Sequence, residues 1–187
     1  MRIYTKSGDL AFKTFNFPDS QPHFVLETYE RDFTSVTIET AIKTPSDVFQ
    51  VLLCADVLRQ HGYTEINLDV RYLLAARMDR AIDSTQPFTL ALVSRLLNGA
   101  GFSKVRILDV HSDVALRLIR NSVNVLPYQV VQNVINTVQP GSIVAPDLGA
   151  VERVGKLAGI VRHVVQCSKH RDMQTGKLSG FTVPQTV

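Results

Sequence analysis

Between residues 35 and 167, short apolar segments suited to β-strands alternate with longer segments whose apolar residues follow helical spacing. The connections between them are short. This alternation predicts an α/β fold, in which a mostly parallel sheet is flanked by helices on both faces. One helix is expected from Pro45 to about His61, because Thr44 is a suitable N-cap, proline is favoured at the first helical position and Gly62 ends the pattern.

The expected elements fill most of the chain. Strands are expected at residues 12–17, 23–29, 35–42, 65–72, 104–109, 123–126, 142–145 and 162–167, and helices at residues 45–61, 85–100, 113–120, 128–138 and 150–159. The first strands form a β-rich N-terminal hairpin region with a turn at residues 18–20. In the second helix, Leu92, Val93, Leu96 and Leu97 are expected to point inward. Pro140 and Gly141 interrupt the pattern and predict two domains, residues 1–140 and 141–187.

Composition limits the class of protein. Hydrophobic residues make up 45% and charged residues 20% of the 187 residues, which is typical of a folded globular chain. The net charge of +3 is too mild for a nucleic-acid binder. Cys54 and Cys167 lie in apolar segments and are expected to be buried free thiols of a reducing compartment. The N-terminus lacks an apolar signal core, and prolines and a glycine interrupt the uncharged residues 121–146, so we expect a soluble cytoplasmic protein without a membrane span.

Polar and charged side chains follow four of the expected strands. They are Arg77, Asp79 and Arg80; Asp109, His111 and Asp113; Asp147 and Gly149; and Lys169, His170 and Arg171. Parallel strands would place all four groups at one edge of the sheet, where ligands of open α/β sheets bind. Carboxylate and imidazole suit a divalent cation, whereas guanidinium and ammonium suit phosphate oxygens. Together they predict chemistry on a Mg²⁺–nucleotide or a sugar phosphate.

Each of these residues also has a purely structural interpretation. Asp113 is equally typical of the first turn of a helix and Ser112 of an N-cap, while Asp109 could shape its loop. Asp79 could pair with a neighbouring arginine, and Lys169 and Arg171 could belong to a solvated turn. His23, His61 and His163 show no partner pattern and are interpreted as structural. Phosphate-loop, dinucleotide, catalytic-triad and zinc motifs are absent from the sequence.

Taken in order, several motifs resemble those of the ribose-phosphate diphosphokinases, also called PRPP synthetases. The family loop Tyr-x-x-x-Ala-Arg-Gln-Asp-Arg is similar to Tyr72-Leu-Leu-Ala-Ala-Arg77-Met-Asp79-Arg80, and the family's Glu-Pro-Ile-Thr is similar to Gln86-Pro-Phe-Thr89. The family's Asp-Leu-His-Ala is similar to Asp109-Val-His111-Ser, and its Ser-Pro-Asp-x-Gly is similar to Ala145-Pro-Asp147-Leu-Gly149. The Lys-x-Arg of the flexible catalytic loop resembles Lys169-His-Arg171, and the adenine-binding hairpin Phe-x-Asp-Gly-Glu resembles Phe17-Pro-Asp19-Ser-Gln21. The ordered set spans nearly the whole chain.

The resemblance implies a phosphoribosyltransferase-like fold and a role for each matching residue. Phe17, Asp19, Gln21, Arg77 and Asp79 would bind ATP, His111 and Asp147 would hold Mg²⁺ at the triphosphate, and Lys169 and Arg171, with His111, would be catalytic. The partners would be ATP and a ribose-phosphate acceptor. In this family Phe17 would reach adenine in a neighbouring subunit, which implies a homo-oligomer.

The chain also departs from the family pattern. Met78 replaces a glutamine, Ser20 and Gln21 replace glycine and glutamate in the hairpin, and Ala150 replaces a glycine. The Asp-Asp…Thr-Gly-Gly-Thr loop that grips ribose 5-phosphate does not occur in the 187 residues. The chain is therefore a fragment, builds its acceptor site differently, or does not catalyse.

Three functional interpretations follow. The first is Mg²⁺-dependent transfer of diphosphate from ATP to ribose 5-phosphate, or to a nucleotide that contains a ribose phosphate, such as ADP-ribose. The second is a non-catalytic nucleotide-binding regulatory subunit or an inactive fragment of such an enzyme. The third is a small α/β domain that serves only in assembly.

Overall fold

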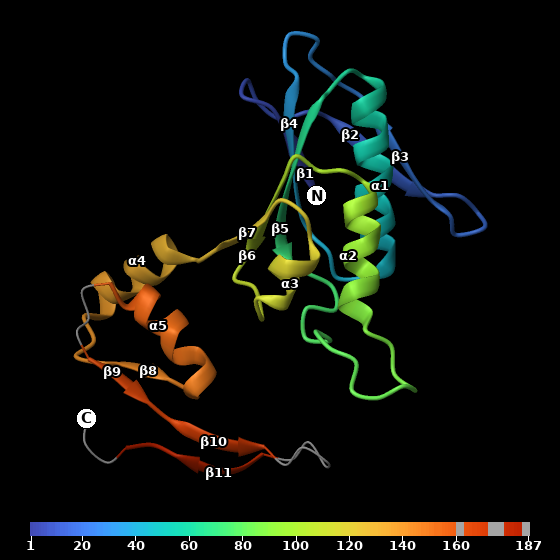
Figure 1. Cartoon of the computed structure of the whole chain (residues 1–187). Coiled ribbons are helices and arrows are strands. Elements are labelled where there is room, and N and C mark those ends of the chain that lie inside the picture. The colour runs from blue at the N-terminus through green and yellow to red at the C-terminus, as the bar shows by residue number, and fades with distance from the viewer. Residues whose placement is uncertain (160–162, 172–177, 185–187) are drawn as a thin grey trace. The chain divides into compact units, whose positions relative to one another are not determined.

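The computed structural model describes residues 1–159, 163–171 and 178–184 (Figure 1). The chain divides into two compact units, unit 1 (Met1–Val125) and unit 2 (Leu126–Val187). Helices alternate with strands, parallel pairs predominate in the main sheet, and the predicted α/β fold is confirmed.

Unit 1 contains a five-stranded sheet in the order β1-β4-β5-β6-β7. Its strands are β1 (Arg2–Tyr4), β4 (Ser35–Ala41), β5 (Glu65–Tyr72), β6 (Lys104–Leu108) and β7 (Ser122–Val125). Strands β4 to β7 are parallel, and only β1 runs antiparallel to its neighbour. The sequence pattern missed β1, because three residues are too few to show alternation. The expected N-terminal hairpin is confirmed as β2 (Phe12–Asn16) and β3 (Pro22–Leu26).

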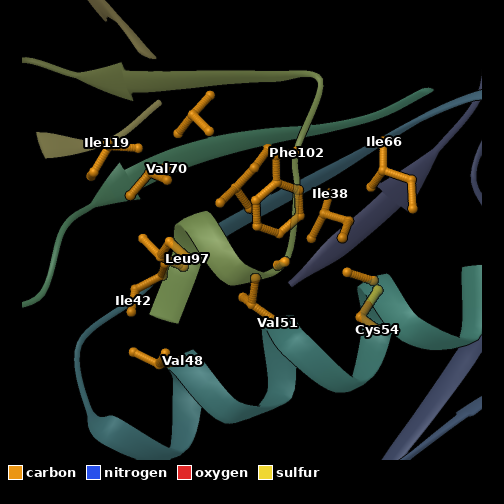
Figure 2. Packing of buried hydrophobic residues seen from close by; sticks show 14 of the residues in the cluster. Ile38, Ile42, Val48, Val51, Cys54, Ile66, Val70, Leu97, Phe102 and Ile119 are labelled. Atoms are coloured by element: carbon orange, nitrogen blue, oxygen red, sulfur yellow. The ribbon is translucent and has the colours of Figure 1, made fainter. Parts of the chain in front are cut away.

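Three helices, α1 (Pro45–Gln60), α2 (Thr89–Gly99) and α3 (Val114–Leu118), contribute buried residues to a single core in unit 1. Figure 2 shows Val51 and Cys54 of α1 on the side of the strand residues Ile38 and Ile66, and Val48 beneath Ile42. Alternate residues of β4 to β6 enter this core, as expected when one face of a sheet is buried.

The other side of these strands is polar within unit 1. The Glu39 carboxylate pairs with Arg71 at 2.9 Å, and Asp69 accepts a hydrogen bond from Arg106 Nε at 2.6 Å. Asp69 is buried, and its partner Arg106 lies on the adjacent strand β6. Ion pairs thus cross neighbouring strands on this face of the sheet.

Helix α1 begins as predicted, and α2 begins later than predicted. Asp83 accepts hydrogen bonds from the backbone N–H and hydroxyl of Thr85 and from the Gln86 amide. This turn holds residues 83–86 outside the helix, which starts at Thr89. The expected inward face is partly wrong, since Leu92 and Leu96 are 50% and 47% exposed. A helix buries one stripe, and here that stripe runs through Leu90, Val93 and Leu97.

The described residues of unit 2 form two small strand pairs and two α-helices. Its elements are α4 (Tyr128–Val138), β8 (Ile143–Ala145), the 3-10 turn η1 (Leu148–Ala150), α5 (Val151–Ala158), β9 (Val164–Gln166), β10 (Ser168–Arg171) and β11 (Leu178–Thr182). β8 and β9 are parallel, and β10 and β11 are antiparallel. The units divide at Val125, whereas the predicted domain limit near residue 140 lies between α4 and β8. The predicted domains themselves stay a prediction.

Both cysteines are buried and unbridged, as predicted. Among the described residues, no helix has the length and apolar character needed to cross a membrane.

Candidate functional site: a nucleotide-phosphate site

The four groups of polar residues lie at the ends of strands in two different sheets. β5 and β6 belong to the sheet of unit 1, whereas β8 and β9 pair with each other in unit 2. The expectation that one sheet edge collects all four groups is therefore wrong. The chain leaves the first sheet after β7 and passes through α4 before the next strand begins.

In unit 1, the loop after β5 carries Arg77 and Asp79. The backbone at Ala75 has φ +62°, an uncommon conformation for a residue with a side chain. The Met78 N–H donates to the Ala75 carbonyl at 2.8 Å, and the Met78 carbonyl accepts from Leu90 N–H at 3.2 Å. These bonds tie the loop to the start of α2 and leave Arg77 exposed to solvent.

The loop after β6 carries Asp109 and His111. Because β5 and β6 are parallel, with Val70 paired to Ile107, this loop leaves the same sheet edge as the first. Asp109 has φ +54°, and its N–H donates to the Val125 carbonyl at 2.9 Å. The next N–H, of Val110, donates to Asn124 Oδ1 at 3.1 Å. The left-handed backbone of Asp109 and these two hydrogen bonds to β7 fix the conformation of the loop. His111 is exposed on this loop.

Ser112 is not an N-cap. Helix α3 begins after Asp113, whose side chain makes no capping bond. The Ser112 hydroxyl is buried and has no hydrogen-bond partner among the residues that the structure describes. Asp113 has helical backbone angles, φ −65° and ψ −9°, so the extended capping geometry is not adopted at the start of this short helix.

In unit 2, Asp147 and Lys169 are in direct contact. Ala145 pairs with Gln166, and Cys167 N–H donates to the Ala145 carbonyl at 2.9 Å, which brings the ends of β8 and β9 together. Asp147 Oδ1 caps η1 by accepting from Ala150 N–H at 3.0 Å, and Oδ2 pairs with Lys169 Nζ.

The charge on Asp147 is stabilised from several directions. The Lys169 ammonium, by hydrogen bond and charge, and the backbone N–H groups of Ala150 and Gly149 hold the pKa of the Asp147 carboxyl below its usual value, against a smaller opposing effect of burial. Asp147 is therefore ionised at neutral pH. The side chains of Lys169 and Asp147 are 40% and 25% exposed, so a ligand can reach the pair.

Lys169 belongs to strand β10, which replaces the solvated-turn interpretation. The backbone of Arg171 pairs with Leu178 in the same hairpin, and its side chain lies outside what the structure describes.

The Asp147 carboxylate has the chemistry of a ligand for a largely hydrated Mg²⁺ ion. Among the described residues, no three His, Cys, Asp or Glu side chains gather to form a metal cage. Mg²⁺ usually takes one or two protein carboxylates and completes its shell with waters and substrate phosphates. One ionised carboxylate oxygen that faces a lysine matches that requirement.

The N-terminal hairpin presents an aromatic cluster. The rings of Phe15 and Phe17 lie 5.2 Å apart, and each lies 5.3 Å from the His23 ring. Phe15 and Phe17 are 44% and 45% exposed. Asp19 Oδ1 accepts from Gln21 N–H at 3.2 Å and shapes the turn, and Gln21 is exposed. The sequence analysis did not anticipate that Phe15 and His23 join Phe17 in this cluster, although the pairing of Phe15 with His23 across the hairpin brings them together.

The fold of the chain is that of the phosphoribosyltransferase-like α/β proteins. A crystal structure of phosphoribosylpyrophosphate synthetase from Mycobacterium smegmatis superposes on 91% of the chain and 59% of its own length, with a TM-score of 0.71 and 17% sequence identity. No protein-family model matches.

The sequence is similar to ribose-phosphate pyrophosphokinases. The enzyme from Pyrococcus furiosus is 27% identical over 149 residues, which cover 78% of this chain and 52% of the relative. The enzyme from Aeropyrum pernix is 29% identical over 169 residues, covering 87% of this chain and 55% of the relative. The chain is thus a homologue of these transferases, and the predicted resemblance is confirmed. It spans about half the length of the curated relatives it matches.

Proposed function

We propose that the protein transfers diphosphate from ATP to a ribose phosphate, with Mg²⁺ as the accompanying cation. The observation that carries the proposal is the contact between Asp147 and Lys169, because it joins a cation ligand and a phosphate-binding cation at two positions of the motifs that resemble the pyrophosphokinase family. The exposed Arg77 and His111 support it, since both stand on loops that leave one sheet edge.

The reaction breaks the bond between the α-phosphorus-linked bridging oxygen and the β-phosphorus of ATP, and a hydroxyl oxygen of the acceptor forms the new bond to the β-phosphorus. AMP leaves with the bridging oxygen, and the hydroxyl proton passes to solvent. Arg77 would orient the phosphates, while Lys169 and Arg171 would offset the charge that develops on the transferred group. Asp147 and His111 would hold Mg²⁺, which neutralises phosphate charge when bound.

ATP recognition is assigned to the hairpin and the loop after β5. Phe17 would stack on adenine, with Asp19 and Gln21 beside it, and Asp79 would accompany Arg77. Because Phe17 stands on an exposed hairpin, we propose that it serves a neighbouring copy in a homo-oligomer. Light scattering of the purified protein tests this, and a strictly monomeric protein would contradict it.

The acceptor is ribose 5-phosphate or a larger nucleotide that carries a ribose phosphate, such as ADP-ribose. Met78, Ser20 and Gln21 motivate the second choice, because each alters a position next to the proposed ATP contacts. Incubation with ATP, Mg²⁺ and either acceptor, with AMP as the measured product, separates the two.

The matched variant is Lys169→Met, which keeps the length of the side chain and removes its charge. Loss of a preorganised charge at a transition state costs about 10²–10³-fold in rate, so AMP formation should fall by that factor. If no AMP forms with ribose 5-phosphate or with ADP-ribose as the acceptor, the proposal is contradicted. Calorimetric ATP binding without AMP release would instead support a non-catalytic nucleotide-binding subunit.

A further inference from the structure

We propose that a divalent cation and the Lys169 ammonium compete for Asp147, so that Lys169 is released for the phosphates only once the cation has bound. The inference rests on the proposed function, because it takes Asp147 as the cation ligand. It adds an order of events at that site.

Asp147 has one carboxylate oxygen that is available to a cation. Oδ1 accepts the Ala150 N–H at 3.0 Å and is part of the cap of η1. Oδ2 is the oxygen that remains, and Lys169 Nζ contacts it.

The Lys169 ammonium and a divalent cation exclude each other at Asp147 Oδ2. A cation on the same oxygen would stand beside a positive charge, and like charges a few ångströms apart repel strongly where solvent is partly excluded. Moving the cation to Oδ1 would require breaking the cap. Binding of the cation therefore displaces Lys169.

Displacement of Lys169 from Asp147 costs little free energy and leaves Lys169 close to the site. The pair is partly exposed, with 40% of the Lys169 side chain accessible, and ion pairs of this kind are weak. The strand register that pairs Ala145 with Gln166 does not depend on the ion pair, so β10 still begins beside the end of β8. The freed ammonium then stays near the site, where phosphate oxygens can separate it from the cation.

Cation binding in the absence of nucleotide tests the competition directly. Mn²⁺ replaces Mg²⁺ as the probe, and its dissociation constant is measured by electron paramagnetic resonance on the full chain. Lys169→Met should bind Mn²⁺ about three- to fivefold more tightly than the unaltered protein, the factor expected when an exposed ion pair stops competing. The gain should shrink at high salt, which screens the pair.

Two further variants make the result interpretable. Lys156→Met removes the same charge from unit 2, where Lys156 pairs with Glu152 at 2.6 Å, and should change Mn²⁺ affinity by less than about twofold. Asp147→Asn should abolish this binding component, and asparagine is an N-cap as good as aspartate, so the fold is expected to survive.

A second measurement follows Lys169 itself. Acylation of lysines, read by mass spectrometry, should speed up at Lys169 when Mg²⁺ is added at constant ionic strength, and should not change at Lys156. Equal Mn²⁺ affinity of Lys169→Met and the unaltered protein, with binding lost in Asp147→Asn, would overturn the competition and leave the proposed function intact. Undiminished binding in Asp147→Asn would remove the cation ligand and so contradict both.

Discussion

At the scale of single residues, the loop after β6 combines strain with an unsatisfied group. Asp109 has a left-handed backbone, and the buried Ser112 hydroxyl has no hydrogen-bond partner within the described parts of the chain. Such features are costly to a fold and concentrate at functional sites. The family motif that this segment resembles has alanine at the position of Ser112, so the hydroxyl is an addition by this chain.

Ser112→Ala should therefore stabilise the protein. A buried hydroxyl without a partner costs about 1–3 kcal/mol, and we expect the free energy of unfolding in urea to rise by about 1 kcal/mol. Ser94→Ala is the control, because the buried Ser94 hydroxyl donates to the Leu90 carbonyl at 2.7 Å and should give no gain. Equal effects of the two substitutions would show that the Ser112 hydroxyl is satisfied in solution.

Gly149, which has no Cβ, leaves space for the Asp147 carboxylate. An alanine at 149 would put its Cβ 3.3 Å from Asp147 Oδ1, closer than side chains normally approach, and the carboxylate must shift by a few tenths of an ångström. We expect Gly149→Ala to weaken Mn²⁺ binding and to leave stability within about 1 kcal/mol of the unaltered protein.

Gly155→Ala provides the matched comparison for Gly149. Gly155 lies inside α5, where an added methyl group would meet only open space, and replacing a helical glycine by alanine stabilises by roughly 0.5–1 kcal/mol. Mn²⁺ binding should not change. If both alanines weaken cation binding equally, crowding of Asp147 is not the cause.

At the scale of elements, α1 is the clearest case of local chemistry that sets a boundary. The Asp47 N–H donates to Thr44 Oγ1 at 3.2 Å, and Thr44 N–H donates to Asp47 Oδ2 at 2.7 Å, so both halves of a capping box are present. Because this arrangement involves residues only three apart, the start of the helix could be predicted from the sequence. Helix α2 shows the opposite case, since the Asp83 turn displaces a start that Thr85 and Pro87 favour by local pattern.

Thr44→Ala should lower the free energy of unfolding by about 1 kcal/mol, which is the usual cost of a lost N-cap. Ser46→Ala is the control, because Ser46 is an exposed neighbour, and it should change the free energy of unfolding by less than about 0.5 kcal/mol. Urea unfolding of both variants measures the difference. A loss of equal size in Ser46→Ala would mean that the cap itself contributes little.

The cap also predicts a dependence on pH. Partial burial raises the pKa of the Asp47 carboxyl, but the N–H groups of Lys43 and Thr44, the Thr44 hydroxyl and the Lys43 charge together lower it more, and the net pKa lies below the ordinary 3.8. Its contribution to stability is present above pH 3.8 and is lost as the pH falls through the lowered folded-state pKa. Asp47→Asn should flatten the stability profile in that acid range.

At the scale of the whole molecule, each compact unit buries one thiol. Cys54 lies in the core of unit 1 and Cys167 in unit 2. Burial raises the pKa of the Cys54 thiol to about 12, so it should not react with a thiol reagent at about pH 8. Both thiols should react in strong denaturant, and each reports the unfolding of its own unit.

Alkaline pH should destabilise the fold through Cys54. The contribution of its thiol to stability is fully present below the unfolded-state pKa of 9.0 and is lost as the pH rises toward the folded-state pKa of about 12. Cys54→Ala removes the titrating group, and the decline of its free energy of unfolding across this window should be shallower. Identical slopes would place the alkaline loss elsewhere.

The sequence by itself determined most of the helices and strands between residues 12 and 167 and the residue types that can do chemistry, but it missed β1, β10 and β11. The bounds of β5 and α4 and the start of α1 agree with the predictions, because hydrophobic period and caps depend on neighbours along the chain. The motifs that contain Arg77, His111, Asp147 and Lys169 are also local, so the resemblance could be recognised from the sequence, while the roles of these residues stay a prediction.

Only the tertiary structure decided how these pieces pair. It separated the strand ends into two sheets, exposed Leu92 and Leu96, and joined Asp147 to Lys169 across 22 positions of sequence, 169 minus 147. The physical reason is that strand pairing and burial arise from contacts between distant segments, and a local period does not specify the partner of a strand or the neighbour of a charge.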